Sequence, residues 1–155
     1  MDLMPKQLPR VIAVDPGLLS GVALFTRNGD SIELTYSGEL TWTELGDWAE
    51  SELGVNPADT AVVCERFTIT DKTAKNSQAP WSLECIGMMQ WLAYRHGAGD
   101  FTLQLVSEAK NMFPNETLKN LDIWHRGGEG HARDAIRHGL LYALKSGWRD
   151  ARLLD

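Results

Sequence analysis

The sequence is poor in cysteine and has no long apolar segment. Its 155 residues include two cysteines, Cys64 and Cys85, too few for the disulfide framework of a small secreted protein. No apolar run approaches the roughly 18 residues of a membrane-spanning helix, and the first residues lack the apolar block of a signal peptide. We therefore expect one globular domain over residues 1–155, working in a reducing cytoplasm.

Positive charge is also scarce. The chain has 15 Lys and Arg against 21 Asp and Glu, a net charge of -6, which argues against a nucleic-acid partner at first sight. The acids are concentrated early, since residues 1–60 hold 3 basic and 10 acidic side chains and residues 61–155 hold 12 and 11. A site for a polyanion would therefore be built mainly from the second part, where some acids are candidates for metal ligands rather than solubilising groups.

Hydrophobic patterning and turn residues predict a hairpin of strands followed by alternating strands and helices. Such an order indicates an α/β fold with a mixed sheet and helices on its faces. In chain order we expect strands at 10–14, 21–26 and 31–36, a helix at 41–53, a strand at 60–64, a polar loop at 66–80, a helix at 81–96, a strand at 101–106, two short helices divided by Pro114 and ending near Trp124, and a helix at 131–145, with Ser107 capping the first short helix.

Four residues with metal-binding chemistry converge on one edge of this sheet. Asp15 and Glu65 lie at the carboxyl ends of predicted strands, where ligands of parallel sheets bind. His131 and Asp134 begin the last helix three residues apart, on one face with His138 and beside the apolar stripe. Neighbouring carboxylates repel each other unless a cation lies between them, and their hard oxygens favour Mg²⁺ or Mn²⁺.

Taken singly, each of these acids has a structural interpretation. Asp15 opens a common Asp-Pro-Gly turn, and Glu65 is followed by Arg66 and could simply face water. Asp134 lies in a first helical turn, where the helix dipole favours an acid. The joint pattern, rather than any one residue, indicates a catalytic site.

Three segments resemble the RuvC-like Holliday junction resolvases, which belong to the ribonuclease-H-like nucleases. They are IAVDPG at 12–17 with GVA at 21–23, VVCE at 62–65 and HARDA at 131–135. The resemblance implies a ribonuclease-H-like mixed five-stranded sheet with helices on both faces, over about residues 10–145. The small size and divergent middle resemble a phage-encoded member, which would act in the cytoplasm of a bacterial host.

The resemblance further implies a catalytic and metal-coordinating set of Asp15, Glu65, His131 and Asp134. These residues would hold two Mg²⁺ ions, with Mn²⁺ able to substitute, and hydrolyse phosphodiester bonds of a four-way DNA junction. The imidazole of His131 could be a ligand or could position the attacking water, and the sequence leaves both roles open.

Candidate DNA contacts follow Glu65 and recur later in the chain. Phe67 is a candidate for an aromatic wedge in the junction, although the family's spacing would place that residue at Thr68; we expect Ile69 to be in the core. The predicted phosphate-binding residues are Lys72, Lys75, Asn76, Ser77, Lys110, Lys119, Arg126 and Arg133.

The helix at 81–96 has apolar residues almost all round, which favours a second apolar contact and hence a homodimer. A two-fold dimer would also match the two symmetric strands of a junction. The glycines at 127, 128 and 130 fit either a hinge or a tight turn before the last helix.

Two alternatives to a junction nuclease remain. A nuclease of the same fold could act on RNA or on an RNA–DNA hybrid. A junction-binding module without catalysis is less consistent with the intact set of acids, because unpaired buried carboxylates are costly to keep.

Overall fold

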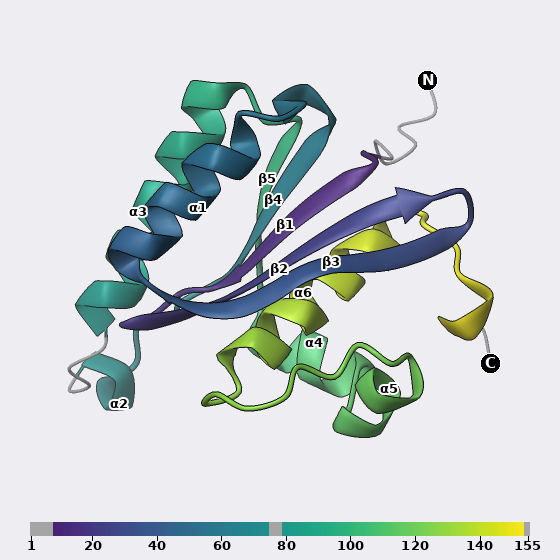
Figure 1. Cartoon of the computed structure of the whole chain (residues 1–155). Helices are drawn as coiled ribbons and strands as arrows, with labels where there is room; N and C mark the ends of the chain where they lie inside the picture. The colour runs from purple at the N-terminus through teal and green to yellow at the C-terminus, as the bar shows by residue number, and fades with distance from the viewer. Residues whose placement is uncertain (1–7, 75–78, 154–155) are drawn as a thin grey trace, which may run out of the picture.

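The computed structural model describes residues 8–74 and 79–153 and shows a mixed five-stranded sheet with helices on both faces (Figure 1). The strands lie in the order β3 (Ser31–Thr41), β2 (Leu19–Asn28), β1 (Arg10–Asp15), β4 (Thr60–Glu65) and β5 (Asp100–Gln104). β1 and β3 each pair antiparallel with β2, whereas β4 runs parallel to its neighbours β1 and β5. The predicted fold class is confirmed.

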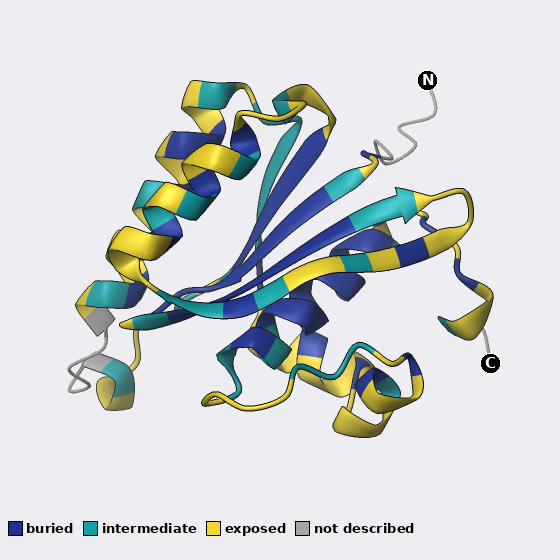
Figure 2. Cartoon of the chain, in the orientation of Figure 1, coloured by how far each residue is buried: buried dark blue, intermediate teal, exposed yellow. Residues whose placement is uncertain are grey.

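Two helical layers cover the sheet. α1 (Trp42–Leu53) and α3 (Ala79–His96) pack on one face, and α6 (His131–Lys145) lies across the other with the short α4 (Val106–Met112) and α5 (Asn115–Asn120) (Figures 1 and 2). β1 therefore has no solvent face: Ile12 and Val14 pack toward α1 and α3, while Val11 and Ala13 pack toward α6.

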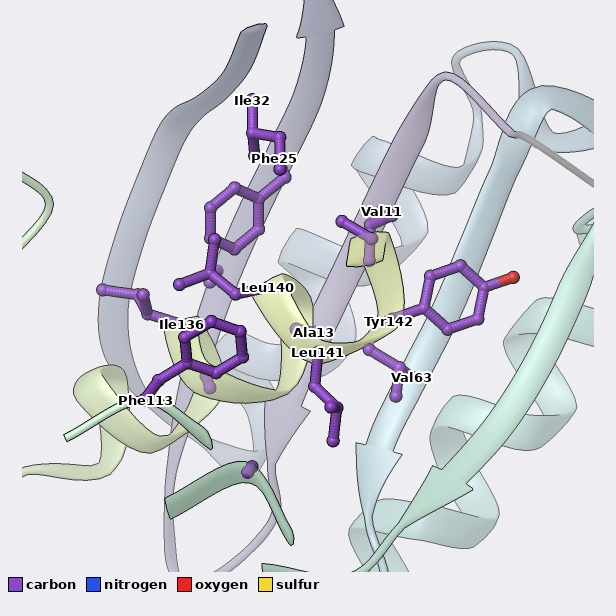
Figure 3. Close-up of a cluster of buried hydrophobic side chains, with 14 of the residues drawn as sticks. Val11, Ala13, Phe25, Ile32, Val63, Phe113, Ile136, Leu140, Leu141 and Tyr142 are labelled. Carbon is purple, nitrogen blue, oxygen red and sulfur yellow. The ribbon is translucent and has the colours of Figure 1, made fainter. Parts of the chain in front are cut away.

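α6 is the most deeply buried helix, and its apolar stripe fits closely against the sheet. Phe25, Ile136 and Leu140 lie together in this core with no more than 1% of their surface exposed (Figure 3). A Cβ atom at residue 139 would lie 2.4 Å from the ring of Phe25. Gly139 therefore allows the helix to approach the strands closely. This short distance between helix and sheet also sets how close the first turn of α6 lies to the sheet edge.

Several boundaries differ from the sequence-based expectation. The segment expected to be one polar loop contains a short helix, α2 (Asp71–Ala74), and α3 begins at Ala79 rather than at 81. β5 ends at Gln104 and α4 begins at Val106, so Ser107 is inside the helix and is not its cap. α5 ends at Asn120, before Trp124. The start of α1 agrees well, because Thr41 and Glu44 form a reciprocal capping box.

The chain after α6 folds back onto the hairpin of β2 and β3. Trp148 is 2% exposed, and a carboxylate oxygen of Asp150 accepts a hydrogen bond of 2.9 Å from the backbone N–H of Ile32. Short 3₁₀ helices occur at Pro57–Asp59 and Ala151–Leu153. In the described residues, no helix has the length and apolar character needed to cross a membrane.

Candidate active site

The two strand-end carboxylates lie at the same edge of the sheet. Asp15 is the last residue of β1 and Glu65 is the last residue of β4, and these strands run parallel with Val14 opposite Cys64. Asp15 is 8% exposed, and Glu65 is half-buried. Adjacent parallel strands thus bring together two acids that are 50 residues apart in the sequence, as predicted.

The first turn of α6 reaches this edge because β2 has a glycine where the helix crosses it. Gly21 lies opposite Asp15 in the β1–β2 ladder. A Cβ atom at residue 21 would lie 1.8 Å from the backbone oxygen of His131, so only glycine accommodates the helix at this height. The close approach places Nδ1 of His131 3.1 Å from Oδ2 of Asp15.

Asp15 and His131 form an ion pair with strongly shifted pKa values. Burial, aided by the charges of Glu65 and Asp134, raises the pKa of Asp15 to about 6 against the opposing hydrogen bond from His131. The bond to Asp15 raises the pKa of His131 to about 9, with partial burial acting in the opposite direction. The effect of Glu65 and Asp134 on Asp15 shows that the three acids share one electrostatic environment.

The other two acids are each bonded to a base from α6. Nε2 of His138 lies 2.9 Å from Oε2 of Glu65, and the guanidinium of Arg137 donates to Oδ1 of Asp134 at 2.8 Å. The sequence indicated that His138 shares a helical face with His131 and Asp134, but gave it no role. Its contact with Glu65 depends on where α6 packs along β4, and helical periodicity in the sequence does not determine that position.

The acids suit a divalent cation in their chemistry, although their present contacts are to bases. Across residues 8–74 and 79–153, no three or more Asp, Glu, His or Cys side chains already form a metal-binding group. Carboxylate oxygens are nevertheless the ligands that Mg²⁺ and Mn²⁺ prefer, and the negative charges of Glu65 and Asp134 add to burial in raising the pKa of Asp15. A cation between Asp15, Glu65 and Asp134 would neutralise that charge.

A further acid, Glu39 on β3, holds the start of α6 in place and was not anticipated from the sequence. Its carboxylate accepts hydrogen bonds from the backbone N–H groups of Glu129, Gly130 and His131, the shortest at 2.8 Å. The glycines before the helix adopt left-handed φ angles, and a Cβ atom at Gly128 would lie 2.4 Å from the Glu39 carboxylate. This geometry favours the tight turn over the hinge.

The basic residues predicted to contact DNA fall into two groups. Lys110 lies beside the acids, with Nζ 3.6 Å from Oδ2 of Asp134. Lys119 and Arg133 both lie over the ring of Trp124, at 4.8 and 4.6 Å from its centroid. Arg133 also donates to the backbone oxygens of residues 125 and 127, so this arginine braces the loop before α6.

The remaining candidates lie farther from these contacts. Lys72 and Arg126 are exposed, and Phe67 is half-buried just after Glu65. Ile69 is 66% exposed, so the prediction that it lies in the core is wrong. The chain leaves the sheet after β4, and Ile69 therefore does not pack in the hydrophobic core. Lys75, Asn76 and Ser77 lie outside the described residues.

An open groove of about 840 Å³ runs from the acids toward Trp124. Its polar lining carries both signs of charge: the acids are Glu116, Glu129 and Asp134, and the cations are Lys110, Arg133 and Arg137, with the amide of Asn115 beside them. The residues that form it include Lys110, Asn115, Trp124, Arg133, Asp134 and Arg137.

The fold is shared with solved Holliday junction resolvases. RuvC of Thermus thermophilus matches with a TM-score of 0.67 at 15% identity, over 90% of this chain and 97% of that chain. The fowlpox virus Holliday junction resolvase matches with a TM-score of 0.57 at 15% identity, over 87% and 97% of the two chains. The yeast mitochondrial Holliday junction resolvase matches with a TM-score of 0.51 at 14% identity, over 94% and 80%. No protein-family model and no curated protein sequence matches this chain.

These similarities define the class of fold, which is the RuvC-type, ribonuclease-H-like fold. The structural match extends over nearly the whole length of both chains. The described strands and helices account for the expected five-stranded architecture.

Proposed function

We propose that the protein is a metal-dependent, structure-selective DNA endonuclease that cuts four-way junctions and other branched DNA. The observation that carries this proposal is the meeting of Asp15, Glu65, His131 and Asp134 at one sheet edge, where Glu65 and Asp134 contribute to the raised pKa of Asp15. The structures that share the fold support the substrate, since one is RuvC with a Holliday junction substrate and another is a fowlpox virus resolvase.

In this proposal Asp15, Glu65 and Asp134 hold Mg²⁺ or Mn²⁺, which would supply an activated water and stabilise the leaving oxygen of the phosphodiester. We propose two ions, as the resemblance to the RuvC-like resolvases implies. His131 contacts Asp15 through Nδ1, which supports a role in orienting that carboxylate and the water beside it.

The DNA would be held next to the acids by side chains and not by the helix dipole of α6, because the Glu39 carboxylate already lies at the start of this helix and accepts from the N–H groups of Glu129, Gly130 and His131. Lys110 and Arg133 in the groove would contact the phosphate backbone, and Lys119 and Arg126 would extend that contact, while Glu116 and Glu129 in the same lining oppose it. Lys72 remains a proposed DNA contact after Glu65, as do Lys75, Asn76 and Ser77, which lie outside the described residues. Phe67 remains the proposed wedge.

A second copy of the chain would complete the enzyme. On α3, Leu83, Trp91 and Tyr94 are 44%, 58% and 79% exposed, which is unusual for large apolar and aromatic side chains on one helix. We propose that this face pairs with the same face of a partner, so that two active sites address the two symmetric strands of a junction. Sedimentation of the purified protein tests this, and a monomer at micromolar concentration would contradict it.

The function is tested with a labelled four-way junction and a matched linear duplex, each incubated with Mg²⁺, Mn²⁺ or EDTA. We expect metal-dependent nicking of the junction and not of the duplex. Asp15→Asn should abolish nicking, whereas Asp59→Asn, an exposed acid beside the opposite end of β4, should not. Junction binding without cleavage under every metal would support a binding module instead, and cleavage of only an RNA–DNA hybrid would support the alternative nuclease.

A further inference from the structure

His138 is a buried polar side chain whose two ring nitrogens are both engaged. It lies in the middle of α6 and is 1% exposed. Nε2 lies 2.9 Å from Oε2 of Glu65, and Nδ1 lies 2.9 Å from the side-chain oxygen of Gln104. An imidazole has no other polar atoms, so its whole hydrogen-bonding capacity is used within this contact.

The contact joins three elements at the active-site edge. Glu65 ends β4, Gln104 ends β5 and His138 comes from α6, so the imidazole bridges the carboxyl ends of two parallel strands. Gln104 is itself 5% exposed, which leaves its side chain little freedom to turn away. Because a carboxylate can only accept, Nε2 of His138 must carry the hydrogen in the bond to Glu65. The bond to Gln104 then requires either a second hydrogen on Nδ1 or a Gln104 amide turned so that its NH₂ group donates to Nδ1.

A core interpretation alone does not explain this arrangement. An apolar residue would fill the same position on the stripe of α6 without the cost of burying polar atoms. The bond does not serve to bury the Glu65 carboxylate either, since 20% of the Glu65 side chain remains accessible to solvent. The bond therefore restricts which way the half-exposed carboxylate faces.

We propose that His138 is a positioning residue for Glu65, with Gln104 fixing the plane of its ring. This inference rests on the proposed nuclease function, because it assigns His138 to the support of one of that site's acids. Partners of this kind fix the direction of a metal-binding carboxylate, and their loss typically reduces metal affinity or activity about 10- to 100-fold. His138 does not itself touch the substrate or the reacting atoms.

The test compares His138→Leu with His138→Gln. Leucine removes the donor, whereas the glutamine amide nitrogen can take the place of Nε2. We expect His138→Leu to lower the single-turnover cleavage rate about 10- to 100-fold and to raise the Mg²⁺ concentration needed for half-maximal rate. Junction affinity in EDTA should stay within about twofold, and His138→Gln should recover most of the rate, since it restores the bond.

Tyr142→Phe is the matched control, because it removes another buried hydrogen bond of α6 one turn further along. The Tyr142 hydroxyl donates to Asp100 at 2.6 Å, away from the acids. If His138→Leu is folded by circular dichroism yet cleaves at the rate and Mg²⁺ dependence of Tyr142→Phe, the proposal is wrong. A loss of rate that His138→Gln does not relieve at all would also overturn it.

A readout independent of cleavage separates this proposal from the proposed function. Nitrogen-15 NMR of the imidazole should show a hydrogen on Nε2 of His138 whose resonance shifts in Glu65→Ala. An unchanged resonance would refute the coupling. If the wild-type protein cuts no nucleic acid, the nuclease proposal fails, while this spectrum still decides whether His138 orients Glu65.

Discussion

Gly21→Ala should disable the active site without changing any residue that touches the substrate. The added Cβ atom would lie 1.8 Å from the backbone oxygen of His131, and real Cβ contacts are essentially never shorter than 3.0 Å. The first turn of α6 would therefore retreat by at least about 1.2 Å from the strand. Such a shift breaks the 3.1 Å bond between His131 and Asp15 and moves Asp134 on the same turn.

The magnitude follows from this displacement. Misplacing a catalytic group by about 1 Å can cost about 100-fold in rate, so we expect at least that loss in single-turnover junction cleavage. Overpacking should also cost about 1–3 kcal/mol of stability, which lowers the melting temperature by several degrees. The pKa of His131, raised to about 9 by its bond to Asp15, should fall toward its ordinary 6.5.

Gly17→Ala is the control for this experiment, because it adds the same methyl group in the turn directly after Asp15. Its Cβ atom would meet nothing closer than 3.4 Å, an ordinary contact. We expect near-normal cleavage and an unchanged His131 titration by proton NMR. Wild-type cleavage in Gly21→Ala, with the His131 pKa still near 9, would refute the reasoning that the glycine sets the height of α6.

Three further outcomes follow from the charges of the molecule. In EDTA, the stability of Asp15→Asn relative to wild type should be higher at pH 8 than at pH 4, because burial raises the folded pKa of the Asp15 carboxyl to about 6 and its ionisation above that pH costs stability, part of which the bond to His131 offsets. Equal differences at the two pH values in urea unfolding would contradict this. The bond from Arg152 holds the pKa of Asp150 well below its ordinary 3.8, so the ionised Asp150 stabilises the fold above pH 3.8 and this stabilisation is lost as the pH falls further. Urea unfolding should show Asp150→Asn about 1–3 kcal/mol less stable than wild type at pH 7, with a smaller difference near pH 3. Lys72→Ala should weaken junction binding and reduce the salt-dependence slope by roughly one, and an unchanged slope would remove Lys72 from the interface.

The parts of the fold with strong periodicity were predictable from the sequence. The helix expected at 131–145 has those bounds in the structure, because its apolar stripe has a regular spacing and all of it packs on the sheet. Apolar residues without such spacing misled the prediction. Leu105 and Val106 prolonged the expected last strand, yet they are 51% and 37% exposed at the beginning of α4.

The site was predictable at the level of its acids but not of their partners. Strand ends of a parallel pair bring Asp15 and Glu65 together whatever the details of packing. The bond from His138 to Glu65 and the cap that Glu39 provides for α6 span 73 and about 90 residues of sequence. They depend on sheet register and helix height, which no local pattern encodes. The metal and DNA assignments stay predictions.

Because α6 is the last α-helix of the described residues, the candidate site stays incomplete for most of the synthesis of the chain. Asp15 and Glu65 emerge early, but Asp134, His131 and the supporting His138 arrive together on α6, after all five strands. The same helix closes one of the two hydrophobic cores. A chain interrupted before residue 131 would lack one wall of that core together with His131, Asp134 and His138, so the candidate site can assemble only after α6 has packed on the sheet.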